Sequence, residues 1–142
     1  MSFTGSKGHC IDPYGNIPGI AAEALTLPQQ DVALAVCYNG SATNGIPQIK
    51  LPDSDGEKPC GVVYGKSYAS GDHCTVARKG RVWMVTGEAS IVLGEDLMTD
   101  ADTGYVLIAT STKDKLGTAA SAQASSGGLI LVELELGTHE PA

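Results

Sequence analysis

Hydrophobic and polar residues alternate in short runs along most of the chain. In the run from Asp31 to Tyr38, the side chains of Val32, Leu34 and Val36 would point to one face of a strand. The side chains of the residues between them would point to the other face. A period of two residues is typical of a β-strand with one buried face. Runs of the same kind predict further strands at residues 49–51, 61–69, 74–78, 82–86, 91–93, 97–99, 105–110 and 129–136.

Turn-forming residues separate these runs. Asn39-Gly40 and Asn44-Gly45 are dipeptides that favour tight turns between antiparallel strands. Lys79-Gly80 stands between two runs rich in β-branched residues, which predicts a hairpin with Trp83 opposite Val76. Short strands joined at close spacing by glycine turns indicate an all-β fold, either a small barrel or a sandwich of antiparallel strands.

The last run, residues 129–136, alternates most regularly. Ile130 and Val132 fall on its apolar side, and Glu133 and Glu135 fall on its polar side. Acidic side chains on an exposed strand discourage pairing with other chains. We therefore expect this strand to lie at a sheet edge.

A weak internal repeat is also visible. Each copy has a glycine at the start of a predicted strand, a second glycine ten residues later, and then a second strand. The copies are Gly61-Val62-Val63, Gly71 and Cys74-Thr75-Val76, and Gly117-Thr118-Ala119, Gly127 and Ile130-Leu131-Val132. The repeat favours a pseudo-symmetric β-barrel.

Residues 1–30 differ from the rest of the chain, because proline and glycine interrupt every hydrophobic pattern there. One interpretation is a disordered tail, which is common at chain ends. The other is an extended arm that becomes ordered on a partner, which the apolar residues favour. We predict an extended N-terminal arm over residues 1–30 and a β-barrel domain over residues 31–142. The apolar residues that could anchor the arm are Phe3, Ile11, Tyr14, Ile17 and Ile20.

Length and charge narrow the class of protein. The chain of 142 residues fits one domain, and 42% hydrophobic residues suffice for a core. Its net charge of −7 comes without the basic stripe of a nucleic-acid binder, so we expect no nucleic-acid partner. No run approaches the roughly 18 apolar residues of a membrane span, and no signal peptide is visible. We expect no membrane partner and synthesis in the cytoplasm.

The four cysteines, Cys10, Cys37, Cys60 and Cys74, are widely spaced and form no C-x-x-C motif. Close cysteine pairs mark structural zinc sites, and a disulfide framework is unusual in a cytosolic chain of this length. We expect free and mostly buried thiols. Whether the thiols oxidise later is left open by the sequence.

Several stretches resemble ligand-binding motifs but have the wrong geometry. Gly61–Ser67 is similar to a phosphate-binding P-loop, but it has three residues between its glycines where the motif needs four. The acidic turns at 53–57 and 100–102 do not complete a calcium loop. His9-Cys10 and His73-Cys74 would point to opposite faces of a strand. We predict no catalytic, cofactor or metal site, and no enzyme activity.

The order of several short motifs resembles the small decoration (cement) proteins on the capsids of tailed bacteriophages. The motifs extend over residues 18–136, and all but the last combine a glycine with strand residues. They are Pro18-Gly19-Ile20-Ala21, Pro59-Cys60-Gly61-Val62-Val63, Ser70-Gly71-Asp72-His73-Cys74-Thr75-Val76-Ala77, Gly80-Arg81-Val82, Leu93-Gly94-Glu95-Asp96-Leu97-Met98-Thr99, Asp102-Thr103-Gly104, Leu116-Gly117-Thr118-Ala119 and Leu131-Val132-Glu133-Leu134.

The resemblance implies a small β-barrel or β-tulip protomer that forms a homotrimer at three-fold positions on the outer surface of the virion. Its partners would be the major capsid protein and other copies of itself, and it would stabilise the expanded capsid. The arm would pair with strands of the capsid protein or of a neighbouring subunit. The candidate contact residues are Phe3, Ile11, Tyr14, Ile17, Ile20 and Trp83.

Two other classes of function stay open from the sequence. A surface or tail-associated adhesion module that binds carbohydrate would need exposed aromatic residues, and aromatic residues make up only 5% of the chain. A small hydrolase with paired carboxylates is compatible with the sequence, because pairing in space is not visible there.

Overall fold

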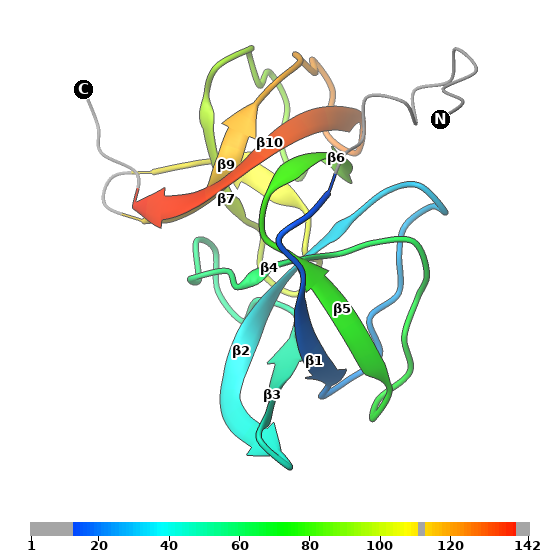
Figure 1. The fold of residues 1–142 in the computed structure, drawn as a ribbon. Coiled ribbons are helices and arrows are strands. Elements are labelled where there is room, and N and C mark those ends of the chain that lie inside the picture. The colour runs from blue at the N-terminus through cyan, green and yellow to red at the C-terminus, as the bar shows by residue number, and fades with distance from the viewer. Residues whose placement is uncertain (1–12, 111–112, 139–142) are drawn as a thin grey trace.

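The computed structural model describes residues 13–110 and 113–138. This part of the chain is all-β, as predicted, and contains no helix long and apolar enough to cross a membrane (Figure 1). Its strands are β1 (Ile17–Ala21), β2 (Leu34–Thr43), β3 (Ile46–Lys50), β4 (Gly61–Val63), β5 (His73–Ala77), β6 (Gly80–Val85), β7 (Asp96–Thr99), β8 (Val106–Ile108), β9 (Asp114–Ala119) and β10 (Leu129–Thr138).

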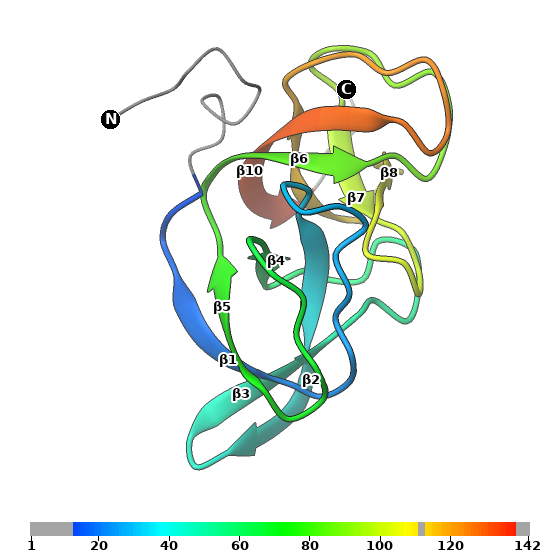
Figure 2. The same ribbon diagram turned by 90° about the vertical axis from the view of Figure 1, so that its right-hand side faces the viewer.

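The strands form a closed barrel and a second sheet, which lie one above the other in Figures 1 and 2. The barrel contains the first five strands in the order β1-β3-β2-β4-β5, and β1 closes it by pairing with both β3 and β5. The second sheet contains the last five strands in the order β6-β10-β9-β7-β8. The predicted small β-barrel is therefore confirmed, and a sheet of equal strand number accompanies it.

The two halves have the same connectivity. In each half the fifth strand pairs antiparallel with the first and the fourth. The second strand likewise pairs antiparallel with the third and the fourth. The parallel β1–β3 pairing that closes the barrel has a reduced counterpart in the parallel bridge between Thr86 and Val106. The chain is thus a structural duplication in which β6–β10 repeat β1–β5.

The register of the strands is duplicated too. Val63 lies opposite Val76 in the barrel, and Ala119 lies opposite Val132 in the second sheet. The repeat predicted from the glycines is therefore confirmed in three dimensions. Further matched pairs are Val36–Gly61 with Leu97–Gly117, Tyr38–Ile49 with Thr99–Val106, and the Gly71 N–H to Ala21 O bond of 2.7 Å with the Gly127 N–H to Thr86 O bond of 2.8 Å.

The first glycine of each copy allows close approach of the neighbouring strand. A Cβ at Gly61 would collide with the carbonyl oxygen of Ala77, and one at Gly117 with the carbonyl oxygen of Glu133. Both obstacles are backbone atoms of the strand ladder, which cannot turn aside as a flexible side chain can. Strand packing therefore requires glycine at positions 61 and 117.

One of the two hydrophobic core clusters joins the two halves. Leu34 and Val36 point into the barrel, whereas Ala33 and Ala35 on the opposite face of β2 pack with core residues of the second sheet. Small side chains on this outer face bring the sheet close to the barrel. Backbone bonds link the halves as well, from Ala33 N to Trp83 O (2.7 Å), Ala35 N to Gly104 O (2.9 Å) and Asp102 N to Pro52 O (2.7 Å). The duplicated halves form a single packed unit.

The predicted hairpin at Lys79-Gly80 is wrong. β5 belongs to the barrel and β6 to the second sheet, and the two strands do not pair. The N–H groups of Arg78 and Lys79 donate to the carbonyl oxygen of Tyr14 instead, at 3.2 and 3.1 Å. Trp83 consequently lies opposite Leu131 of β10 and not opposite Val76. The glycine here lets the chain cross from one half to the other.

Two other local predictions need correction. Asn44-Gly45 forms the predicted turn, with φ of 52° and 80°, but Gly40 (φ 90°) lies inside β2, where the pairing with β3 shifts register. A glycine with positive φ serves a bulge as readily as a turn. β10 is not an edge strand, because it lies between β6 and β9.

The predicted strand at 91–93 is reduced to one bridge between Ile91 and Gln123. Val92 and Leu93 are exposed in the turn that follows, where the N–H of Glu95 donates to Val92 O (3.3 Å). The predicted strand at 61–69 ends at Val63.

The N-terminal arm does not extend to residue 30. β1 is a barrel strand, and Leu25 and Leu27 are buried in the barrel core. The prolines and glycines that suggested an arm are compatible with a barrel strand, because β1 receives its hydrogen bonds from β3 and β5. An arm could occupy only residues before β1, of which residues 1–12 lie outside the described part of the chain.

Candidate functional site

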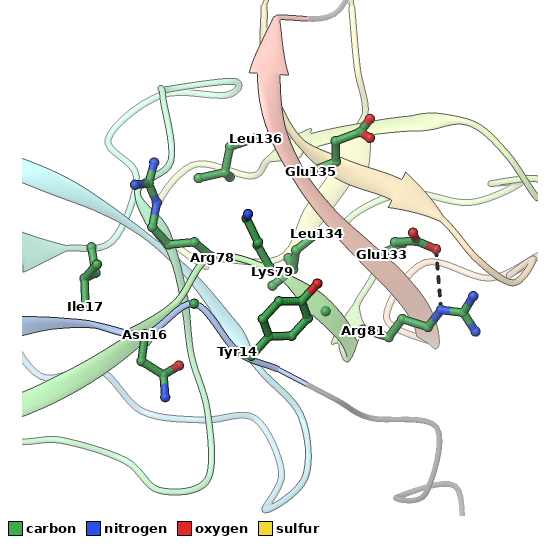
Figure 3. A pocket seen from close by; sticks show the side chains of 12 residues that line it. Tyr14, Asn16, Ile17, Arg78, Lys79, Arg81, Glu133, Leu134, Glu135 and Leu136 are labelled. Atoms are coloured by element: carbon green, nitrogen blue, oxygen red, sulfur yellow. Dashed lines mark ion pairs between the residues drawn. The ribbon is translucent and has the colours of Figure 1, made fainter.

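A broad open groove runs along one side of the second sheet, where the N-terminal segment meets β10 (Figure 3). Its volume is about 1140 Å³. The residues that line it come from three stretches, 14–17, 78–81 and 133–136. We call this feature the β10 groove.

The backbone fixes one wall of the β10 groove. The N–H of Tyr14 donates to Lys79 O (2.9 Å), which holds the N-terminal segment against the crossing between β5 and β6. Gly15 adopts φ of 70°, and a Cβ added there would meet the aliphatic part of the Lys79 side chain at 3.5 Å. The Tyr14 side chain is 54% exposed and lies beside Lys79 and Leu134 in Figure 3.

The carboxylates of the groove are neutralised by neighbours. Glu133 pairs with Arg81 at 3.4 Å, the contact marked in Figure 3, and Glu135 pairs with Lys115 at 2.8 Å. The hydrogen bond that the Lys115 ammonium donates to Glu135 raises the pKa of Lys115, and Asp96 at 3.6 Å acts in the same direction. Lys115 therefore stays charged well above neutral pH.

Two cations of the groove are not balanced in this way. Arg78 and Lys79 are exposed, and neither forms an ion pair with a carboxylate of the described residues. A smaller hollow of about 150 Å³ also contacts Arg78 and Leu136, and its other charged residues are Lys58, Lys115 and Asp114. The groove therefore carries excess positive charge on a protein whose net charge is −7.

Part of β10 has a partner strand on one side only. β6 pairs with β10 as far as Leu134, whereas β9 pairs with it as far as Thr138, with a register shift between Leu134 and Gly137. Residues 135–138 therefore have no strand partner on the β6 side within the described chain. This open edge begins at the β10 groove, because Glu135 and Leu136 line the groove.

The structure separates the residues that the sequence grouped as contacts. Tyr14 and Ile17 line the β10 groove, whereas Ile20 is only 8% exposed and offers little side chain to a partner. Trp83 is half-buried on β6, and its carbonyl helps to join the two halves. That Tyr14, Ile17 and Trp83 contact a partner stays a prediction. Phe3 and Ile11 lie outside the described residues.

The described cysteines are Cys37, Cys60 and Cys74, and all three are free and buried, as predicted. Burial raises the pKa of Cys37 and of Cys60 to about 12 and that of Cys74 to about 11. A thiolate is the reactive form of cysteine, so these side chains are unreactive near neutral pH. Cys10 lies outside the described residues.

The stretch that resembles a P-loop consists of the buried strand β4 and the loop that follows it. The Ser67 hydroxyl accepts a hydrogen bond from the N–H of Leu27 (2.9 Å), and the Lys66 ammonium lies 5.3 Å from the centre of the Tyr68 ring. No helix follows the loop, so backbone N–H groups do not converge there as phosphate binding requires. The loop serves to join β4 to β5.

The acidic turns hold the two halves together. Asp55 accepts a hydrogen bond from the N–H of Ala101 (2.9 Å), and Thr103 donates to Asp100 (3.0 Å). Burial raises the pKa of Asp100, and the adjacent carboxylate of Asp55 raises it further. The folded protein therefore holds a proton on Asp100 more tightly than the unfolded chain does.

An Asp100→Asn variant is expected to melt at a higher temperature than the wild type at pH 7. A raised pKa in the folded state means that stability is lost as the pH rises from the ordinary value of 3.8 through the folded value. Asparagine cannot ionise, so the variant should lose less stability between pH 4 and pH 7. Thermal melts over this range measure the effect, with the exposed Asp102→Asn as control. An equal gain in the control would contradict the explanation.

Comparison with known proteins gives one informative match. The fold is similar to a solved structure described as the head fiber gp8.5 N base in bacteriophage phi29, with a TM-score of 0.61 and 18% sequence identity. The match covers 89% of this chain and 98% of the other. No protein-family model matches the chain, and no curated protein matches it. The two chains therefore share a fold through almost their whole lengths.

Sequence reasoning missed the β10 groove. The hairpin predicted at Lys79-Gly80 would place Arg78, Lys79 and Arg81 at a solvated tip, and that hairpin does not form. The three residues share one short segment, but only the crossing between the halves places them beside β10. The available signal was the concentration of basic residues in a chain with nine of them in total.

Proposed function

We propose that this protein is a bacteriophage capsid decoration protein that binds the outer surface of the head as a homotrimer at three-fold positions and stabilises the expanded capsid. The observation that carries the proposal is the fold shared with the N base of a phage head fiber. The proposal also agrees with the resemblance of short motifs over residues 18–136 to decoration proteins.

Physical features of the chain support a structural role. One core cluster is shared between the two halves, and the thiols of the described cysteines are buried and protonated near neutral pH. A protein that binds only the expanded shell stabilises that shell by mass action. Neither chemistry nor a cofactor is needed for such a role, and we propose none.

Co-sedimentation with expanded heads that lack their decoration protein tests the proposal directly. We expect binding to saturate at three copies per three-fold position. Decorated heads should also withstand a higher temperature than undecorated heads. Light scattering of the free protein should give the mass of a trimer. A monomer that does not sediment with heads would contradict the proposal, and binding to immobilised glycans instead would favour an adhesion module.

A further inference from the structure

We propose that the β10 groove is a docking site for an extended, acidic segment of a partner protein, which adds as a strand to the open edge of β10 at residues 135–138. The inference deepens the proposed capsid attachment and rests on it only for the identity of the partner. The geometry of the groove concerns this chain alone.

The first argument is the unused backbone of β10. On the side where β6 pairs with the first half of the strand, residues 135–138 have no strand partner among the described residues. Proteins usually cover, shorten or charge such edges, because an open edge invites pairing. An extended segment that pairs there gains main-chain hydrogen bonds irrespective of its sequence.

The second argument is the charge beside that edge. The carboxylates of Glu133 and Glu135 are already paired with Arg81 and Lys115. Arg78 and Lys79 have no such partner among the described residues, although acidic residues outnumber basic ones by 16 to 9 in the chain. Two unbalanced cations next to an open edge complement carboxylates on the incoming strand.

The third argument is the shape and lining of the groove. Tyr14 and Leu136 give it apolar surface on two sides; in Figure 3 Lys79 lies between them and Arg78 lies to one side. A strand places alternate side chains on opposite faces, so one face can meet apolar surface while the other meets the cations. The groove fits a segment in which apolar and acidic residues alternate.

The test uses the full-length protein and a capped peptide of alternating valine and glutamate. The peptide has about seven residues, which is the length of an ordinary strand. In nuclear magnetic resonance titrations, we expect amide shifts at residues 78–79 and 135–138. The double variant R78Q/K79Q should bind the peptide about tenfold more weakly. The matched variant K66Q/K113Q removes two lysine charges outside the groove and should bind it as the wild type does.

A second peptide separates strand addition from charge attraction. It has the same side chains, but every backbone amide is N-methylated, which removes the N–H donors of both strand edges. We expect it not to bind. Equal binding of the two peptides, or equal loss in both double variants, would overturn the proposal. Displacement of the peptide by single-stranded DNA would show an anion site instead and would also overturn it.

Because these titrations contain no capsids, they are independent of the test of the proposed function. If the protein binds the peptide but not heads, the docking site is supported and the proposed capsid function is contradicted. If the wild type and R78Q/K79Q bind heads equally well and the peptide does not bind, only the docking-site proposal is contradicted.

Discussion

Replacing Gly117 by alanine is expected to destabilise the protein by about 3 kcal/mol and to lower its melting temperature by about 10 °C. The new Cβ would collide with the carbonyl oxygen of Glu133 and approach the Leu134 Cα to 3.1 Å. Both atoms belong to β10, which pairs with β6 on its other side and cannot retreat. Chemical denaturation with a second probe of folding measures the loss.

Gly137→Ala is the matched control, because Gly137 lies on the same pair of strands. A Cβ there would meet only the Lys115 Cε at 3.7 Å, which is an ordinary contact. We expect a change within about 0.5 kcal/mol, as for most surface substitutions. Equal stability of the two variants would refute the steric explanation.

The duplication extends this prediction to the barrel. Gly61 occupies in β4 the position that Gly117 occupies in β9. Unlike Gly117, Gly61 also adopts a positive φ, of 149°, which side chains disfavour. Gly61→Ala should therefore be at least as destabilising as Gly117→Ala. A harmless Gly61→Ala would show that the two positions are not equivalent.

Removal of residues 1–21 is expected to abolish folding, because it removes the strand that closes the barrel. β1 pairs with β5 on one side and β3 on the other, and Ala21 is almost fully buried. Without β1, both neighbouring strands become open edges and the barrel core is exposed to water. Loss of amide dispersion and of a cooperative melt would show this result.

Removal of residues 1–12 is the matched control and separates the arm from the barrel. Every described hydrogen bond of the barrel is retained in this variant, so we expect a wild-type melt. The arm hypothesis predicts that this variant no longer sediments with heads. Full occupancy of heads by the shortened protein would contradict the arm hypothesis, and unfolding would show that residues 1–12 belong to the barrel.

The fold class could be predicted from the sequence because strand periodicity is a local property. The alternation from Val32 to Val36 and at residues 129–136 predicted strands that the structure contains. The glycine repeat could also be recognised, since close approach of two strands leaves no alternative to glycine at positions 61 and 117. These features depend on immediate neighbours along the chain or on the adjacent strand.

Pairing between distant strands could not be predicted. Lys79-Gly80 looks like a hairpin turn in sequence, and only the partners of β5 and β6 show that the chain crosses between sheets. The same limitation hid the β10 groove, which depends on Tyr14 meeting Lys79 and on β6 beginning at Gly80, opposite Leu134. Residues 17–27 were likewise assigned to an arm, because their partner strands lie far along the chain.

The doubled architecture has an evolutionary consequence. Two units with one connectivity and one register point to the duplication of an ancestral gene segment, after which each unit could change its own loops while the shared core kept the frame. The Asn44-Gly45 hairpin tip and the turn at 100–104 occupy corresponding places in the two units. One has become a protruding hairpin and the other part of the seam between the halves, so a single ancestral loop has acquired two roles.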